Sequence, residues 1–212
     1  MNKSLKNLSN EIISFYKRSK YKKQKHLHEP FFNYEDIKSV NNAIKKKEVS
    51  TYGNFVLEFE KKIARFIKSK FCTATINGTS ALHLALLSLD VGKRDEVLIP
   101  SVSFIAAANS ISYCGATPYF IDSELETFGV DIKKLEEFLK KNTKLVNGKC
   151  FNKKTGKQIK AIIAVHVFGL SMKIRELIKL AKKYRIFVVE DAAEALGSYN
   201  SKKHLGTFGD IG

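Results

Sequence analysis

The feature that most constrains the fold of this 212-residue chain is an alternation of strand and helix patterns between residues 71 and 189. Short apolar runs alternate with segments whose apolar residues recur at helical spacing. The runs are apolar along both faces, which is typical of parallel strands covered by helices on both sides. We therefore predict an α/β fold with a mostly parallel sheet. The predicted strands are 71–76, 96–99, 118–121, 159–167 and 186–189, and the predicted helices are 80–89, 103–113, 131–140 and 173–184.

The segments around this alternation differ from it. Helices are predicted at 33–47 and 55–67, each with an apolar face and a lysine-rich face, and both are expected to cover a core. Residues 1–28 are predicted to be a basic N-terminal extension with a short amphipathic helix. Residues 29–212 are predicted to form one principal domain, because the length and the 44% hydrophobic content suffice for one full core and are short for two. The polar stretch 141–158 is expected to be a surface excursion or small hairpin.

Composition narrows the class of function. The formal net charge of +16 would allow nucleic-acid binding, but the basic residues are mostly lysines scattered over many polar faces. We expect no nucleic-acid partner, because the richness in Lys, Asn and Ile indicates a compositional bias rather than a binding patch. An anionic ligand or an acidic partner segment outside this chain would also explain the charge. No apolar run approaches the roughly 20 residues of a membrane span, and no signal peptide is recognisable, so we expect no membrane partner and a cytoplasmic location. The three cysteines, at positions 72, 114 and 150, are too far apart to suggest a disulfide framework or a metal site.

Two predicted strand ends carry residues that suit a ligand. Residues that follow parallel strands meet at the carboxyl edge of the sheet, where ligands gather. Gly78, Thr79 and Ser80 begin an apolar helix, and the backbone N–H groups and hydroxyls there would bind a phosphate, although they are also ordinary capping residues. The segment lacks the lysine and spacing of a P-loop, which disfavours nucleotide hydrolysis. Phe104 begins the next helix and could stack on a planar ring or pack in the core.

A third strand end, FVVEDAAEALGS at 187–198, runs from a buried strand into two adjacent acids, Glu190 and Asp191. A buried carboxylate is costly unless it meets a cation or fixed hydrogen-bond donors. Asp191 is therefore either the N-cap of a following helix or the partner of a cation. A phosphate, a flat ring and a protonated ring nitrogen together describe pyridoxal 5'-phosphate (PLP), whose pyridine nitrogen a buried carboxylate keeps protonated.

Six segments from residue 29 onward occur in a characteristic order: STYGNFVLEFEKKIARF, NGTSALHLALLSL, DEVLIPSVSFIAAANSISYCGATPYFID, VHVFGL, VVEDAAEALGS and GTFGDIG. In these segments the chain resembles the DegT/DnrJ/EryC1/StrS sugar aminotransferases, which have the aspartate-aminotransferase type of fold. LHEP, NKKTGKQIKA and EDAAEALGS are most similar to the branch that aminates C4 of nucleotide-linked 4-keto-6-deoxy sugars for bacillosamine- or legionaminic-acid-type products. The resemblance implies that residues 29–212 are the large, PLP-binding domain.

The resemblance also implies six cofactor-binding residues, at the phosphate, the ring face, the pyridine nitrogen and the ring hydroxyl. In that order they are Gly78, Thr79 and Ser80, then Phe104, then Asp191, and then Glu194. Glu194 stands where the family usually has Gln or His. We interpret His166, in VHVFG, as a structural residue or as one that supports the site through a residue that contacts the cofactor.

In the family, the Schiff-base lysine lies beyond the position of Gly212, so no catalytic residue is assigned and neither Lys202 nor Lys203 takes that role. The chain is expected to be the truncated N-terminal part of an enzyme, without the lysine segment and the C-terminal small domain, and inactive alone. The full enzyme would be a homodimer that transfers an amino group from glutamate to C4 of a nucleotide sugar in cell-surface polysaccharide or glycan biosynthesis. A PLP-dependent sugar dehydratase of the same family and a noncatalytic binding protein are the alternatives.

Overall fold

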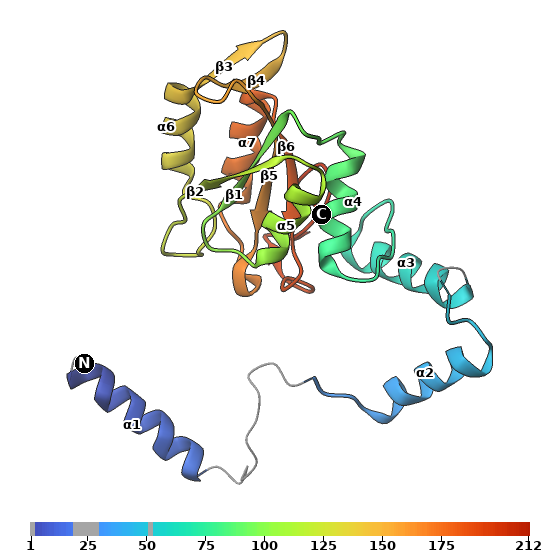
Figure 1. Cartoon of the computed structure of the whole chain (residues 1–212). Helices are drawn as coiled ribbons and strands as arrows, with labels where there is room; N and C mark the ends of the chain where they lie inside the picture. Colours follow the sequence, from blue (N-terminus) through green and yellow to red (C-terminus); the bar gives the residue numbers. More distant parts are fainter. Residues whose placement is uncertain (1–2, 19–29, 51–52) are drawn as a thin grey trace. The chain divides into compact units, whose positions relative to one another are not determined.

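The computed structural model describes residues 3–18, 30–50 and 53–212, which form two compact units, Met1–Thr51 and Tyr52–Gly212 (Figure 1). The first unit contains helices α1 (Lys3–Arg18) and α2 (Tyr34–Lys45). The predicted boundary between residues 28 and 29 lies outside the described residues. None of the described helices is long and apolar enough to cross a membrane.

Helix α2 begins at a capping box. The Asn33 side chain accepts a hydrogen bond from the Asp36 N–H at 3.0 Å, and the Asp36 carboxylate accepts one from the Asn33 N–H at 2.8 Å. The predicted helix is confirmed, but the prediction that it covers a core is wrong, since α2 has no buried residue and Val40 is 60% exposed. An amphipathic pattern indicates which face a helix would bury and does not supply a surface to receive it.

A six-stranded mixed sheet forms the centre of the second unit as the structure describes it, in the order β2-β1-β5-β4-β3 with β6 beside β5 (Figure 1). Strands β1, β2, β5 and β6 are parallel, and β3 and β4 are antiparallel. The strands are β1 (Asp95–Pro100), β2 (Thr117–Ile121), β3 (Thr143–Val146), β4 (Lys149–Asn152), β5 (Gln158–Val165) and β6 (Phe187–Asp191). The mostly parallel sheet confirms the predicted fold class.

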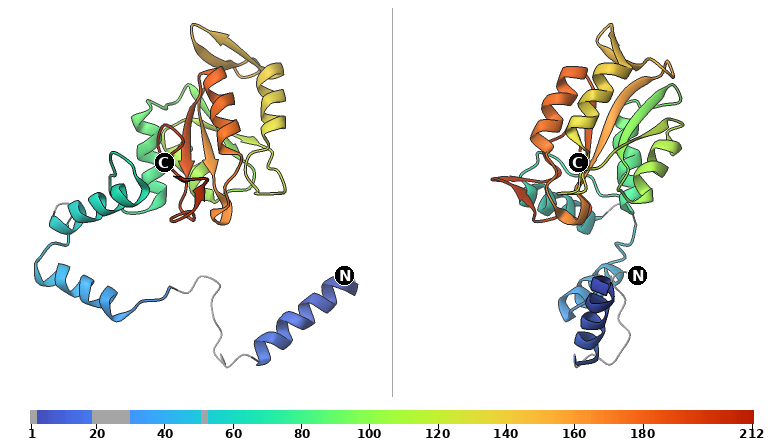
Figure 2. Two further views of the ribbon diagram at one scale, coloured as in Figure 1. Left: turned by 180° about the vertical axis from the view of Figure 1, so that it is seen from behind. Right: turned by 90° about the vertical axis from the view of Figure 1, so that its left-hand side faces the viewer.

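Helices cover both faces of this sheet (Figure 2). Helices α6 (Ile132–Asn142) and α7 (Ile174–Tyr184) pack on one face, over a cluster that includes Leu98 and Val188. Helices α4 (Gly78–Ser88) and α5 (Ile105–Tyr113) pack on the other face, over a cluster that includes Val97 and Val189. Each central strand therefore contributes alternate side chains to two separate cores.

The region between α6 and β5 forms the small hairpin that the sequence indicated. Strands β3 and β4 are joined by Asn147 and Gly148, both of which have positive φ angles, 49° and 73°. Two adjacent residues with positive φ make the tight turn whose twist matches that of the flanking strands. The buried Asn152 side chain donates a hydrogen bond of 2.9 Å to the Glu96 carboxylate and so fastens β4 to β1.

One predicted strand is wrong, and the helix predicted at 55–67 is less buried than expected. Residues 71–76 form no strand and end in a bend at residue 76, and the Ala74 N–H donates to the Glu60 carboxylate at 2.8 Å. An apolar, strand-like run needs a neighbouring strand, which its own residues do not specify. Helix α3 (Asn54–Ile67), predicted correctly as a helix, has several half-buried residues and no fully buried one.

Short elements complete the carboxyl end of the sheet. They are the 3₁₀ turn η1 (Val167–Gly169) and the small hairpin of β7 (Tyr199–Asn200) and β8 (Lys203–His204). After β8 the chain returns along the free side of β6, where Ile211 forms a parallel bridge with Val189. The Gly209 position approaches β6 so closely that a Cβ there would lie 2.5 Å from the Val188 carbonyl oxygen, which explains the glycine.

Candidate active site

A cavity of about 450 Å³ lies at the carboxyl edge of the parallel strands, on the α4 and α5 side of the sheet. This volume is within the usual range for a small-molecule site. Four of the six predicted site residues line it, while Thr79 and Ser80 do not. The lining residues are Gly78, Leu82, Val102, Ser103, Phe104, Ala106, Val165, His166, Val167, Phe168, Asp191, Ala193 and Glu194.

The N-terminus of α4 forms one wall of the cavity. Asn77 is its N-cap, and the Asn77 side chain accepts the Ser80 N–H at 2.8 Å. Among the described residues the Gly78 and Thr79 N–H groups have no such partner, and a Cβ at Gly78 would meet no atom within 4 Å. The helix end therefore presents backbone donors, a positive dipole end and open space, the arrangement that receives an anion.

The N-terminus of α5 carries the aromatic side chain that sequence analysis selected. Phe104 is the N-cap residue of this helix, so the helix begins at Ile105 rather than at the predicted residue 103. The Phe104 side chain is 75% exposed. It is therefore not a core residue within this chain, and its ring is available for stacking beside the cavity.

Strand β6 ends on two carboxylates with opposite environments. Glu190 points to the α7 side of the sheet and is 2% exposed, and it accepts hydrogen bonds from the backbone N–H groups of Gly206 (3.0 Å), Phe208 and Gly209 (2.6 Å). Its carboxylate also lies 2.9 Å from Nε2 of His166. Burial raises the pKa of Glu190, but these hydrogen bonds outweigh burial and hold the pKa below its ordinary value.

Asp191 points to the other side of the sheet, into the cavity. Its carboxylate accepts one hydrogen bond, from the Ala193 N–H at 3.2 Å. The residues that follow form turns and not a helix, so the alternative of a helix N-cap is wrong. Burial raises the pKa of Asp191, and the Ala193 N–H and the charge of His166 oppose burial only in part. A cation in the cavity would stabilise this carboxylate.

Glu194 lines the cavity but already has a partner. Its carboxylate accepts the Phe168 N–H at 2.7 Å and so holds the turn after β5. Phe168 has φ 53°, which is rare for a bulky residue, and a Cβ on the next residue, Gly169, would lie 2.7 Å from the Glu194 carbonyl oxygen. Glu194 therefore fixes the conformation of the cavity wall.

His166, which was expected to be structural or to support the site through a neighbour, lies in the wall of the cavity. This residue follows β5 directly, lines the cavity and is 1% exposed. Its backbone N–H donates to the Asp191 carbonyl oxygen at 3.0 Å. Its Nδ1 atom is the one buried side-chain nitrogen or oxygen without a hydrogen-bond partner in the part of the chain that the structure describes. The available signal was its place at the end of a strand, which is the criterion that selected Asp191.

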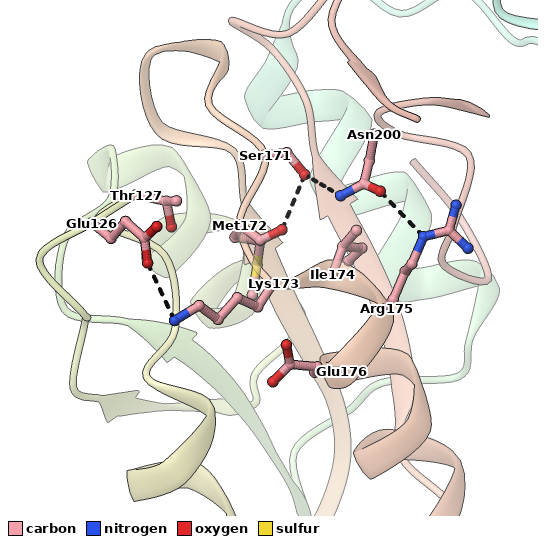
Figure 3. A pocket seen from close by; sticks show the side chains of 9 residues that line it. All are labelled: Glu126, Thr127, Ser171, Met172, Lys173, Ile174, Arg175, Glu176 and Asn200. Atoms are coloured by element: carbon pink, nitrogen blue, oxygen red, sulfur yellow. Dashed lines mark hydrogen bonds and ion pairs between the residues drawn. The ribbon is translucent and has the colours of Figure 1, made fainter. Parts of the chain in front are cut away.

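A second hollow, of about 240 Å³, surrounds the start of α7 (Figure 3). Its polar side chains bind one another. Lys173 lies 3.4 Å from the Glu126 carboxylate, and Asn200 links Arg175 (3.1 Å) to Ser171 (2.9 Å). None of the predicted site residues lines this hollow. Because its charged groups are largely satisfied internally, it is the weaker candidate for a ligand site.

The cavity at the carboxyl edge suits PLP in three respects. It offers backbone donors at a helix N-terminus, an exposed aromatic ring, and a carboxylate that accepts one hydrogen bond from the residues that the structure describes. The Nδ1 atom of His166, which has no hydrogen-bond partner among the described residues, is a further buried polar atom of a residue that lines the cavity. Within the described residues, no group of three or more His, Cys, Asp or Glu side chains could hold a metal ion.

Comparisons with known proteins agree with this assignment. GDP-perosamine synthase of Escherichia coli O157:H7 is 36% identical over 185 residues, which are 87% of this chain and 46% of that protein. The dTDP-3-amino-3,6-dideoxy-alpha-D-galactopyranose transaminase of Aneurinibacillus thermoaerophilus is 32% identical over 176 residues, which are 83% of this chain and 44% of that protein. The chain thus spans less than half the length of these relatives.

The fold has close counterparts among solved structures. The aminotransferase from Psychrobacter cryohalolentis superposes with a TM-score of 0.73 at 28% sequence identity, over 85% of this chain and 42% of that one. The DegT/DnrJ/EryC1/StrS aminotransferases are pyridoxal phosphate-dependent enzymes. The characteristic sequence pattern of this family matches residues 31–212, and the chain therefore belongs to the DegT/DnrJ/EryC1/StrS aminotransferase family.

Proposed function

We propose that this chain is the cofactor-binding part of a PLP-dependent sugar aminotransferase that acts on a nucleotide-linked sugar. The observation that carries the proposal is Asp191, a carboxylate that lines the cavity and accepts a single backbone hydrogen bond. When bound, PLP supplies an electron sink that requires a protonated pyridine nitrogen. Asp191 holds that proton by pairing with the ring nitrogen.

The other predicted residues bind and orient the cofactor. The N–H groups of Gly78 and Thr79 and the Ser80 hydroxyl bind the phosphate, since Asn77 already occupies the Ser80 N–H. The exposed Phe104 ring stacks on the pyridine ring. Glu194 stands near the ring hydroxyl and acts through the Phe168 backbone that it holds.

Equilibrium dialysis of the 212-residue chain against PLP tests the cofactor site. Asp191→Asn removes the charge but not the shape of the side chain, and we expect the dissociation constant to rise at least tenfold, equivalent to about 1.4 kcal/mol. Asp90→Asn, an exposed aspartate in the turn after α4, is the matched control. Equal affinities of wild type and Asp191→Asn for PLP would contradict the proposal.

The substrate proposed is a nucleotide-linked 4-keto-6-deoxy sugar that receives its amino group at C4 from glutamate. The motifs LHEP, NKKTGKQIKA and EDAAEALGS support C4, whereas the Aneurinibacillus relative is named for a 3-amino sugar. The gene product that carries this chain is to be incubated with glutamate and a 4-keto or a 3-keto nucleotide sugar. NMR of the product should place nitrogen at C4, and amination at C3 alone would refute this choice. Loss of the hydroxyl without amination would identify a dehydratase.

The remaining proposals concern the chain as a whole. We propose that residues 1–28 form an extension and 29–212 a large domain, that the full enzyme is a cytoplasmic homodimer, and that these 212 residues alone do not transfer amino groups. PLP and glutamate added to the chain should yield no 2-oxoglutarate. If 2-oxoglutarate forms, borohydride reduction and peptide mass spectrometry would identify the lysine responsible, and the last proposal fails.

A further inference from the structure

We propose that Phe168 is a specificity-determining residue whose ring packs against the apolar C–H side of the sugar that the enzyme aminates. The inference rests on the proposed function, because it assigns this residue a contact with the substrate of that reaction. The carrying observation is an exposed aromatic residue in the cavity wall, on a backbone conformation that bulky residues rarely adopt.

The first step concerns the backbone of Phe168. Its angles in η1, φ 53° and ψ 24°, lie in the left-handed region, which is unfavourable for a bulky residue and free of strain for glycine. The Glu194 carboxylate accepts the Phe168 N–H at 2.7 Å. A Cβ on the next residue, Gly169, would lie 2.7 Å from the Glu194 carbonyl oxygen. Backbone contacts with the loop after β6 therefore hold this turn, and the phenyl ring is not what fixes it.

The second step concerns the side chain of Phe168. It is 71% exposed, and its ring lies edge-to-face with that of Phe128, with 6.5 Å between the ring centroids. That separation is near the long end of the range for aromatic pairs, so the contact stabilises the ring little. A core role would bury the ring, and a turn role alone would favour Gly or Asn. Backbone strain without compensating burial is typical of residues that bind a ligand.

The third step selects the sugar as the ligand of this ring. Phe168 and Asp191 line the same cavity. Amino transfer requires the keto carbon of the sugar to reach the cofactor that pairs with Asp191, so the sugar must enter this cavity, whereas the nucleotide is separated from it by the phosphates. Phe104 is already assigned to the cofactor ring. The negative face of a phenyl ring attracts the partially positive C–H groups of a pyranose, and a 6-deoxy sugar adds a methyl group to that apolar side.

Calorimetric titration of the gene product that carries this chain, loaded with PLP, tests the contact. The PLP form cannot aminate a keto sugar, so binding is measured without turnover. The probes are 4-keto-6-deoxy sugars linked to GDP, dTDP and UDP, and the three free nucleotides. Phe168→Ala should raise the dissociation constant of the tightest-bound nucleotide sugar about five- to tenfold and leave that of its free nucleotide unchanged. Phe168→Tyr, which keeps the ring, should bind the sugar as the wild type does.

Leu170→Ala is the matched control, because Leu170 follows the same turn, is 45% exposed and does not line the cavity. It should leave all dissociation constants unchanged. Equal affinities of wild type and Phe168→Ala for the nucleotide sugar would overturn the inference. An equal loss of affinity for the free nucleotide would place the ring against the base and would also overturn it. Absence of PLP binding by the wild type would instead refute the proposed function.

Thermal denaturation of the 212-residue chain tests the strain without any ligand. Phe168→Asn replaces the ring with a residue that tolerates positive φ, so the Tm should be equal to that of the wild type or higher by up to about 3 °C. A lower Tm would show that the ring stabilises the protein by packing, within the chain or against a second copy, and would overturn the inference.

Discussion

The two faces of the β-sheet are covered by helices of different character. The outer surfaces of α6 and α7 are polar and include the exposed Lys140–Glu136 ion pair at 2.9 Å. The outer surfaces of α4 and α5 carry exposed apolar side chains, with Leu84 48%, Leu87 47% and Ile105 63% exposed. The cavity lies on the second face. The face of α6 and α7 therefore has a polar outer surface, and the face of α4 and α5 combines a ligand cavity with an apolar outer surface.

This difference indicates where stability and function reside. A helix with apolar residues only on its inner side is fully accounted for by packing against one sheet. Among the described residues, nothing covers the apolar residues on the outer side of α4 and α5. We take them as support for the proposed homodimer, with this face as the interface.

Removal of a core side chain from the α6 and α7 face should cost the most stability. Leu177 of α7 is fully buried, and Leu177→Ala should lower the free energy of unfolding by about 2–5 kcal/mol through lost burial and a residual cavity. Leu84→Ala on the outer side of α4 is the matched control and should cost less than about 1 kcal/mol. Urea denaturation measures both, and equal losses would remove the distinction between the two positions.

Charges placed on the outer side of α4 should weaken self-association. Leu84→Asp combined with Leu87→Asp should raise the dimer dissociation constant about 100-fold, because it puts desolvated carboxylates in an apolar contact. Analytical ultracentrifugation over a concentration series measures the change. Lys140→Asp on α6 serves as the control, and equal effects of the two variants, or no self-association of the wild type, would contradict the assignment of the interface.

Asp191→Asn should stabilise the folded chain at neutral pH. Since the pKa of Asp191 is raised in the folded chain, its protonated side chain favours the folded state. This stabilisation is fully present below the ordinary pKa of 3.8 and is lost as the pH rises through the folded pKa. The variant removes that loss, with a gain of about 0.5–2 kcal/mol at pH 7 and little gain near pH 3. Thermal denaturation at the two pH values measures it. A destabilised variant at pH 7 would mean that the ionised carboxylate is well solvated or paired.

The smallest effect is expected at the polar surface of α6. Lys140→Ala removes an exposed ion pair with Glu136 and should change the free energy of unfolding by less than about 0.5 kcal/mol, with the change decreasing further in high salt. Urea denaturation at low and high ionic strength measures this. A decrease in the free energy of unfolding above about 1 kcal/mol would show that the outer side of α6 contributes substantially to stability.

The sequence patterns predicted the positions of helices and strands better than they predicted what each helix or strand packs against. The apolar runs located most strands and helices of the second unit, and the helix predicted to begin at residue 131 has Asp131 as its N-cap, which accepts hydrogen bonds from the Lys133 and Lys134 N–H groups. The run at 71–76 failed because strand formation depends on a neighbouring strand. The same dependence explains α2, whose pattern gives a face but no surface to cover.

The candidate site followed a similar rule. Asp191 and Phe104 were predictable because each stands directly at a strand or helix end, and the topology brings such ends together. The contact of Glu194 with the Phe168 backbone and the burial of His166 were not predictable, since both depend on how two loops pack. The sequence pattern identifies Asp191 but not the loop residues that pack around the cavity.

The adjacent acids at the end of β6 limit what insertions and deletions this protein tolerates. Because side chains alternate along a strand, Glu190 can bind the N–H groups of Gly206 and Gly209 only if Asp191 points into the cavity. Loss or gain of one residue in β6 would exchange the two carboxylates, placing the longer side chain in the cavity and the shorter one against the loop. Length changes are therefore far better tolerated in the turn between β3 and β4, at Asn147 and Gly148, than anywhere between Phe187 and Asp191.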